Sequence, residues 1–417
     1  MVGGPESLRL MVVAGEESGD AHAAALVRAL GRRAPATRFE FFGSTGARLR
    51  EAGVESVVRE DDLAITGLLE IARALPRFAA AHRALRRAAI ERRPDAVVLV
   101  DWPDFNLALA RALRRRGLKI IYYISPQLWA WRAHRVRQVR RDVDLMLTIL
   151  PFEREWYAAR GVAHVEFVGH PLAERARPRA GRAEFCARHG LDPSRPLVAL
   201  LPGSRRKEFE RILPVMLDAA ALVSGARPRP RLSEARPGAQ SPETRPGAQF
   251  VVALASRRSR EEAERVIAAH PEAARLAPLI RLAHDEAREA MSAADAAAVC
   301  SGTATLEAAL LAAPLVVVYK ESALNWHTLG RLITVEHYGL VNLVAGHRLA
   351  PELMQDDFNG PSLARELLAL LDPVNNEHAR ARLREATACL GEGGASQRAA
   401  DAVLRAVRDW KKEGEKF

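Results

Sequence analysis

Short apolar runs alternate with longer amphipathic segments through most of the chain. Residues 8–15, LRLMVVAG, form an apolar run, and residues 20–33 follow with apolar positions at helical spacing. The same alternation recurs at 94–101, PDAVVLVD, and 104–117, DFNLALARALRRRG. Nearly continuous apolar strands separated by helices are typical of a parallel sheet that helices cover on both faces.

The predicted strands form two series, separated by the Pro- and Arg-rich segment 171–185. The first series comprises residues 8–15, 38–43, 94–101, 119–125, 144–150 and 164–170. The second comprises residues 196–203, 249–255, 278–284, 297–302 and 314–320, and the chain from about residue 360 is predicted to be helical. We therefore expect an α/β protein with two domains, 1–172 and 173–390, whose sheets turn their carboxyl ends toward a cleft between them.

Residues 224–249 interrupt the second series. The segments 234–240, EARPGAQ, and 243–249, ETRPGAQ, nearly repeat each other within a stretch dense in Pro, Arg and Gly. Such a composition buries too little apolar surface to order itself, so we predict a flexible insertion without a part in the chemistry.

Charge points to an anionic partner without identifying it. The 417 residues include 62 Lys and Arg against 51 Asp and Glu, a formal charge of +11. This excess suits nucleic acid, anionic lipid or a phosphorylated ligand, but it also fits solvated helix faces. The cysteines, Cys186, Cys300 and Cys389, lack metal-binding spacing and suggest a reducing cytoplasm. No apolar run reaches the length of a membrane span, and the N-terminus does not resemble a signal peptide.

A basic turn in LVALLPGSRRKEFERIL, residues 197–213, suggests a phosphate site. Gly203 and Ser204 let backbone amides approach an anion at the start of a helix, and Arg205 adds a bidentate donor. The cations would otherwise be unfavourable there, because the amino end of a helix already carries partial positive charge. The alternative is an ordinary turn with solvated cations.

A second turn, Ser301-Gly302-Thr303, closes one predicted strand and opens a helix. Thr303 is a candidate N-cap, and Glu307 shares its helix face one turn later. A carboxylate there could accept hydrogen bonds from a ribose diol. Alternatively, it is a favourable charge near the helix start. Together, the two turns suggest a nucleotide diphosphate site.

Acidic residues follow two strands of the first domain. Asp101 lies at the carboxyl end of a predicted strand, where it could act as a general base or be a turn residue. Asp104 is expected to cap the helix that follows. Glu16, Ser18 and Asp20 form an acidic loop that could bind sugar hydroxyls or cap its helix.

Two basic segments, 75–93 and 125–141, suit an anionic membrane or a phospholipid-like ligand. The second contains Trp129 and Trp131, which could instead belong to a core.

Taken together, these motifs resemble the lipid-A-disaccharide synthase family across nearly the whole chain. The matching stretches are VAGEESGD (13–20), LAITGLLEI (63–71), DWPDFN (101–106), SPQLWAWR (125–132), LPFE (150–153), FVGHPL (167–172), LPGSRRKE (201–208), SGTATLE (301–307) and LVNLVAG (340–346).

The resemblance implies a fold of two Rossmann-like domains of the GT-B type, with a helix at about 395–415 returning to the first domain. The first domain would bind the acceptor and the second the UDP-sugar. The implied reaction joins UDP-2,3-diacylglucosamine to 2,3-diacylglucosamine 1-phosphate (lipid X) through a β-1,6 linkage with inversion, releasing UDP without a metal or other cofactor. The implied catalytic residues are Asp101 as general base and Arg205, and the implied binding residues are Gly203, Ser204, Ser301, Gly302, Thr303, Glu307, Asn342, Glu16, Ser18 and Asp20.

The family also implies a cytoplasmic protein bound peripherally to the inner membrane, with a possible homodimer and no nucleic acid. The alternatives are another GT-B enzyme, either a UDP-N-acetylglucosamine 2-epimerase or an N-acetylglucosaminyltransferase, and a basic nucleic-acid-binding protein. The last explains the charge, but the sequence contains no recognised nucleic-acid-binding module.

Overall fold

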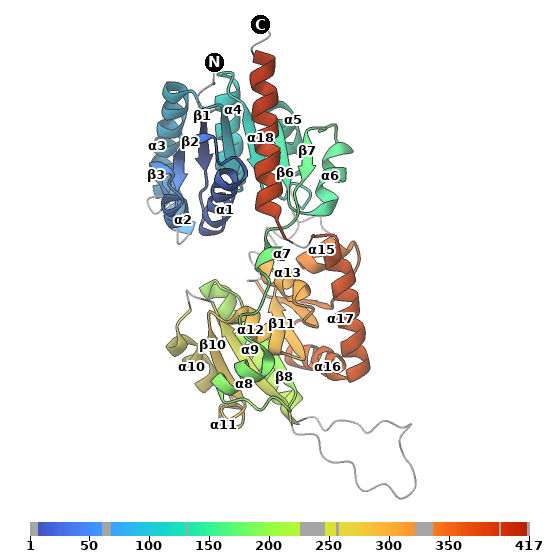
Figure 1. The fold of residues 1–417 in the computed structure, drawn as a ribbon. Coiled ribbons are helices and arrows are strands. Elements are labelled where there is room, and N and C mark those ends of the chain that lie inside the picture. The colour runs from blue at the N-terminus through green and yellow to red at the C-terminus, as the bar shows by residue number, and fades with distance from the viewer. Residues whose placement is uncertain are drawn as a thin grey trace, which may run out of the picture. The chain divides into compact units, whose positions relative to one another are not determined.

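The chain forms two compact units, each built on one parallel sheet (Figure 1). The computed structural model describes residues 7–60, 68–130, 132–225, 247–255, 258–321, 337–391 and 393–414. Unit 1 comprises Met1–Glu174 and Leu390–Phe417, and unit 2 comprises Arg175–Cys389. Most of the predicted insertion 224–249 lies outside the described residues.

The sheet of unit 1 has the strand order β3-β2-β1-β4-β5-β6-β7. Its strands are β1 (Ser7–Val13), β2 (Arg38–Thr45), β3 (Glu55–Arg59), β4 (Ala96–Val100), β5 (Ile120–Tyr123), β6 (Leu145–Thr148) and β7 (Val165–Phe167). All neighbouring strands pair in parallel. Strands β4 and β5 are buried along their whole length, as their unbroken apolar sequences require.

Helices cover both faces of this sheet. They are α1 (Glu17–Arg33), α2 (Ala47–Glu51), α3 (Leu68–Arg92), α4 (Pro103–Arg114), α5 (Val136–Asp142), α6 (Pro151–Ala158) and α18 (Ala395–Gly414), with the short α7 (Leu172–Arg175) at the boundary. One core lies under α1 and α18, and the other lies under α3, α4 and α5. The last helix returns to unit 1 and lies beside α1, where Arg33 donates to both oxygens of Asp401 at 2.6 and 2.8 Å (Figure 1).

The sheet of unit 2 has the order β10-β9-β8-β11-β12-β13. Its strands are β8 (Leu197–Leu201), β9 (Gln249–Leu254), β10 (Ile280–His284), β11 (Ala296–Cys300), β12 (Leu315–Tyr319) and β13 (Glu352–Met354). Its helices are α8 (Arg182–His189), α9 (Arg206–Gly225), α10 (Arg260–Ala268), α11 (Ala273–Leu276), α12 (Ala287–Ala293), α13 (Thr303–Leu310), α15 (Leu340–Ala345), α16 (Gly360–Leu371) and α17 (Pro373–Ala388).

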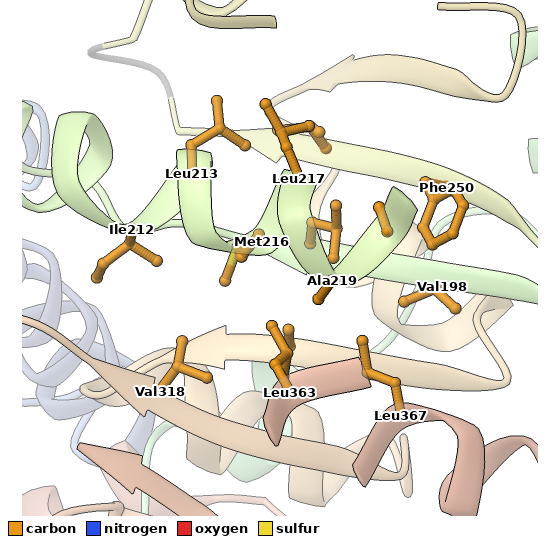
Figure 2. Close-up of a cluster of buried hydrophobic side chains, with 14 of the residues drawn as sticks. Val198, Ile212, Leu213, Met216, Leu217, Ala219, Phe250, Val318, Leu363 and Leu367 are labelled. Carbon is orange, nitrogen blue, oxygen red and sulfur yellow. The ribbon is translucent and has the colours of Figure 1, made fainter. Parts of the chain in front are cut away.

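Helix α9 fixes the position of the basic turn through its buried face. Met216 of α9, Val318 of β12 and Leu363 of α16 are fully buried members of one cluster (Figure 2). Burying side chains of this size contributes roughly 2 kcal/mol each. The amino end of α9 is therefore held firmly at the carboxyl edge of the sheet.

The predicted fold class is confirmed, since both units are open, parallel, doubly covered sheets. The edge strands β3 and β13 are absent from the two predicted series of strands. Both are short, and their sequences ESVVR and ELM contain too few apolar residues to stand out. An edge strand pairs on one side alone, which relaxes the demand for a buried apolar sequence.

Candidate active site

In unit 1, the loops that follow β1 and β4 lie side by side because these strands are neighbours. Gly15 in the first loop touches Trp102 in the second so closely that an added Cβ would lie 2.0 Å from Cδ2 of the indole. Trp102 in turn stacks on Phe105, with ring centroids 4.0 Å apart. A glycine at position 15 therefore lets the acidic loop approach Asp101.

Asp101 has an unusual backbone that two buried side chains hold in place. Asp101 and Trp102 both have φ +50°, a left-handed conformation that costs energy in residues other than glycine. The carbonyl oxygen of Asp101 accepts hydrogen bonds from the Tyr122 hydroxyl at 2.6 Å and the Asn106 amide at 2.8 Å. These bonds fix the direction in which the carboxylate leaves the strand.

Burial and the nearby charge of Glu16 raise the pKa of Asp101 to about 6, against an ordinary value of 3.8. Desolvation is the larger cause, because burial penalises the charged form of a carboxyl. Glu16 and Ser18 are exposed at the start of α1. A carboxylate with a pKa close to neutral is suited to accept a proton from a hydroxyl group.

Asp20, also in the acidic loop, is buried and bound to backbone. Its carboxylate accepts hydrogen bonds from the amides of Gly46, Arg48 and Leu49 at 2.7, 2.8 and 3.2 Å. It thereby satisfies free N–H groups at the start of α2 rather than capping its own helix. This carboxylate holds the segment after β2, whereas Glu16, Glu17 and Ser18 of the same loop are exposed.

Asp104 does not cap α4, contrary to the prediction. Trp102 is the N-cap residue and Pro103 is the first helical residue, whose missing N–H suits that position. Oδ1 of Asp104 instead pairs with Nη1 of Arg132 at 2.8 Å and Nη1 of Arg135 at 2.5 Å. The aspartate therefore links α4 to the segment that follows β5.

In unit 2, the two predicted nucleotide turns also lie at adjacent strand ends, because β8 pairs with β11. Gly203 has φ +103°, and a Cβ on it would meet Oε2 of Glu208 at 3.0 Å and Sγ of Cys300 at 3.2 Å. Glycine is thus required both by its backbone and by the lack of space. The structure brings the basic turn into contact with the end of β11.

Arg205 lies immediately before α9, and its side chain is 82% exposed. Its Nη1 pairs with Oε1 of Glu208 at 2.9 Å, and Glu208 is much less exposed, at 13%. Arg206 pairs with Glu210 in the next turn of the helix. Ser204 is exposed beside Arg205. The guanidinium of Arg205 is accessible to a ligand, but a carboxylate already neutralises part of its charge.

The second turn differs from the prediction at its cap. Gly302, with φ +143°, is the N-cap residue of α13, and Thr303 is the first helical residue. Ser301 donates from Oγ to the carbonyl oxygen of Tyr338 at 3.0 Å, so it ties the turn to the segment before α15. Burial raises the pKa of Glu307, and Nε of Arg288 lies 3.5 Å from its carboxylate.

Asn342 is fully buried, and its side-chain amide is satisfied by the protein. It donates to the carbonyl oxygen of Ala350 and to Oε1 of Glu352, and its own oxygen accepts from the amides of Leu349 and Ala350. An amide offers two donors and two acceptor positions, and all are used. Asn342 therefore holds the segment around α15 in shape, and a ligand would have to break these bonds to reach its side chain.

The residues that orient the candidate site residues are not among those predicted from the sequence. Tyr122 and Asn106 hold Asp101 through its carbonyl oxygen. Glu208 pairs with Arg205. The carboxylate of Glu352 accepts a hydrogen bond from the backbone amide of Tyr338 at 3.1 Å. Glu208 was within reach of sequence reasoning, because a glutamate three residues after an arginine at a helix start can pair with it. The sequence carries no comparable signal for Tyr122.

Within the described ranges, no group of three or more His, Cys, Asp and Glu residues is arranged to hold a metal ion. Among the helices described there, none is both long enough and apolar enough to cross a membrane.

Comparison with known proteins decides the family. Residues 10–234 and 237–405 match the family model described as lipid-A-disaccharide synthetase. The chain belongs to the lipid-A-disaccharide synthase family. A lipid-A-disaccharide synthase of Geobacter sulfurreducens is 42% identical over 95% of this chain and 97% of its own length. One from Myxococcus xanthus is 41% identical, with the same coverage of each chain.

Solved structures from outside the lipid-A-disaccharide synthase family share the fold. A putative UDP-N-acetylglucosamine 2-epimerase from Listeria monocytogenes is 15% identical, with a TM-score of 0.60, over 98% of this chain and 97% of that one. A calicheamicin glycosyltransferase is 16% identical, with a TM-score of 0.57, over 96% of this chain and 98% of that one. At such identities the likeness concerns architecture, and it places this chain among proteins with two Rossmann-like domains.

Proposed function

We propose that this protein transfers 2,3-diacylglucosamine from its UDP derivative to 2,3-diacylglucosamine 1-phosphate and forms the β-1,6-linked disaccharide 1-phosphate and UDP. Membership of the lipid-A-disaccharide synthase family supports the reaction class. The observation that carries the mechanism is Asp101, a carboxylate at the carboxyl end of β4 with a pKa of about 6.

In this mechanism Asp101 is the general base. It takes the proton of the acceptor's 6-hydroxyl as that oxygen attacks the anomeric carbon of the donor sugar, and the bond to UDP breaks with inversion. Tyr122 and Asn106 orient Asp101 through its carbonyl, while Glu16 helps to keep its pKa near neutral. Glu16 and Ser18 are also exposed polar residues that can contact the acceptor sugar.

The departing diphosphate gains negative charge, which the basic turn of unit 2 is suited to stabilise. Arg205 supplies an accessible guanidinium, and the free N–H groups at the start of α9 lie beside Gly203 and Ser204. Donors that are already in place stabilise a developing charge at little reorganisation cost. Glu208 competes for Arg205 until the diphosphate replaces it.

The turn before α13 would bind the nucleoside end of UDP. Ser301, Gly302 and Thr303 offer hydroxyl and amide groups at the neighbouring strand end, and Glu307 offers a carboxylate for the ribose. Asn342 contributes indirectly, since it shapes the segment whose Tyr338 carbonyl binds Ser301.

The deciding experiment mixes the purified protein with both acylated substrates and follows UDP release and disaccharide formation by mass spectrometry. Formation of both products supports the proposal. Turnover of UDP-N-acetylglucosamine alone, or with a lipid-pyrophosphate acceptor, and no reaction with the acylated pair would favour one of the other GT-B enzymes.

We also propose that the protein works on the cytoplasmic face of the inner membrane as a peripheral protein. The exposed face of α3 supports this: Leu75 is 61% exposed, and Arg77, Arg83 and Arg87 are exposed along the same helix. Apolar and basic side chains together suit the interface of an anionic bilayer. That the protein forms a homodimer is a prediction, and measuring its molar mass in solution by light scattering would test it.

A further inference from the structure

The paired arginines at Asp104 have no part in the mechanism described above. Nη1 of Arg132 and Nη1 of Arg135 both contact Oδ1 of Asp104, at 2.8 and 2.5 Å. The Asp104 side chain is 63% exposed, and those of Arg132 and Arg135 are 38% and 23% exposed. Two cations thus converge on one accessible carboxylate oxygen.

We propose that Arg132 and Arg135 bind the phosphate monoester of the acceptor sugar, with Asp104 as the internal anion that this phosphate displaces. The inference rests on the proposed function, because it assigns the far end of the acceptor whose hydroxyl Asp101 activates. A phosphate monoester carries a charge of about −2 at neutral pH, which matches two guanidinium groups better than one carboxylate does. Arginine also presents a fork of donors that fits phosphate oxygens.

The segment that carries both arginines is held in place by a buried network. Trp129 donates from Nε1 to Oε1 of Glu153 at 3.2 Å, and Ser125 Oγ lies 2.9 Å from the hydroxyl of Tyr157. Glu153 is buried and also accepts from the backbone amide of Leu150 at 3.0 Å. This network anchors Ser125 and Trp129, which precede the two arginines in the segment after β5.

The arginine pair lies near the proposed base. Asp104 follows Asp101 by three residues, so their Cα atoms are at most about 11 Å apart. The Arg135 cation also acts on Tyr122, whose hydroxyl binds the carbonyl of Asp101: burial and the Asp101 charge raise the pKa of this phenol, and Arg135 opposes the rise. In the acceptor, one pyranose ring separates the 6-hydroxyl from the phosphate at carbon 1. Asp101 and Arg135 thus both lie close enough to act on Tyr122, and the upper bound on the Cα separation leaves room for one pyranose ring.

The competing explanation is that the ion pairs of Asp104 with Arg132 and Arg135 only stabilise the fold. Removing the charge of Asp104 distinguishes this structural role from a phosphate site. If the three residues merely hold the fold, Asp104→Asn and Arg135→Gln break the same contact and change activity in the same direction. If they form a phosphate site, the changes have opposite signs, because Asp104→Asn removes a competitor and Arg135→Gln removes a ligand.

The test measures KM for each variant with two acceptors, 2,3-diacylglucosamine 1-phosphate and the same acylated sugar without its phosphate. For the phosphorylated acceptor, we expect Arg135→Gln and Arg132→Gln to raise KM at least tenfold and Asp104→Asn to lower it, with the donor KM unchanged. For the acceptor without phosphate, wild type and the variants should have the same KM within about twofold. Arg137→Gln removes an exposed cation of the neighbouring α5 and is the matched control, expected to behave as wild type.

Equal losses with both acceptors, or an Asp104→Asn variant that loses affinity as Arg135→Gln does, would overturn the phosphate site. Thermal unfolding of each variant checks that the fold is intact. These outcomes are distinct from failure of the proposed function, in which the wild-type protein forms no disaccharide from either acceptor.

Discussion

Asp101 combines three features that a turn residue would not need. Its backbone is left-handed, its carbonyl is held by Tyr122 and Asn106, and its carboxyl is desolvated next to Glu16. The left-handed backbone and the desolvated carboxyl each cost stability when considered alone, and the two hydrogen bonds to the carbonyl offset part of that cost. Their coincidence on one residue at a sheet's carboxyl end is typical of a catalytic group.

Replacing Asp101 with Asn should reduce kcat by about 10²–10⁴-fold, the usual contribution of a general base, and leave UDP affinity unchanged. For the wild type, kcat/KM should fall as pH drops below about 6, because the protonated carboxyl cannot accept a proton. Steady-state kinetics and UDP titration by calorimetry measure both effects. A variant with near-normal kcat would remove Asp101 from the mechanism.

The same substitution should stabilise the protein above pH 6. The pKa of Asp101 is about 6 when folded, against an ordinary value of 3.8, so the folded state binds this proton more tightly than the unfolded state does. The stability that the bound proton provides is present below pH 4 and is lost as pH rises through about 6. Denaturation at pH 7.5 should show Asp101→Asn to be more stable by on the order of 1–3 kcal/mol, with the difference shrinking toward pH 4.

Tyr122→Phe should disturb catalysis with little effect on binding. The variant loses one hydrogen bond to the Asp101 carbonyl, so the base is less well oriented, and we expect kcat to fall about tenfold, a change of about 1.4 kcal/mol in activation free energy. Tyr157→Phe is a matched control for kcat, since its buried hydroxyl contacts Ser125 and supports the arginine segment, where a loss would appear in the acceptor KM. An equal loss of kcat in the two variants would indicate a general effect of deleting a buried hydroxyl.

Glu208→Gln should tighten UDP binding. The diphosphate must displace Glu208 from Arg205 and approach a carboxylate, and a neutral amide removes this competition. A gain of about 1 kcal/mol, or about fivefold in Kd, is reasonable for an accessible ion pair. Glu210→Gln breaks the Arg206 pair one turn further on and should leave Kd within about twofold of wild type. Weaker UDP binding by Glu208→Gln would mean that Glu208 positions Arg205 rather than competing for it.

At the scale of elements, the last helix completes unit 1. Ala400, Val403 and Leu404 of α18 are buried in the core that also contains Val27 and Leu30 of α1. Without α18, this face of the sheet would expose apolar side chains to water. The C-terminal helix is thus a structural part of the unit that contains Asp101.

Leu404→Ala should destabilise unit 1 by about 2–4 kcal/mol, the range for removing a buried leucine side chain. Arg408→Ala on the exposed face of the same helix should change stability by less than about 0.5 kcal/mol. Urea denaturation followed by circular dichroism measures both. If the two variants were equally stable, α18 would not be part of the folding unit.

At the scale of the whole molecule, the net charge of +11 and the exposed basic face of α3 both favour an anionic surface. Each basic residue near such a membrane contributes about 1 kcal/mol, and salt screens this attraction. Part of this charge excess, which is ambiguous in the sequence by itself, lies on exposed positions of α3.

We expect the protein to bind vesicles that contain anionic phospholipid and to release them as salt rises. Arg77→Gln combined with Arg83→Gln should weaken vesicle binding by about tenfold or more, whereas two charge losses at Arg38 and Arg116, exposed elsewhere on unit 1, should have a smaller effect. Vesicle flotation at several salt concentrations measures this. Equal effects of the two double variants would mean that net charge matters and α3 does not.

Local pattern determined much of this protein. The alternation of apolar runs with helical spacing is a property of neighbouring residues, so it predicted the two parallel sheets and the turns where Gly203, Arg205, Ser301 and Asp101 lie. The motifs around these turns also predicted the family, which the comparison confirmed.

Tertiary structure decided what each polar group is bonded to. Tyr122 reaches Asp101 from a neighbouring strand, Asp20 satisfies the amides of α2, and Asn342 uses its whole amide on its own unit. A hydrogen bond depends on distances of tenths of an ångström between residues far apart in the chain, and such distances exist only after packing has fixed every element. Hydrophobic periodicity can therefore place a functional loop, but it cannot tell which of its polar side chains the fold leaves available.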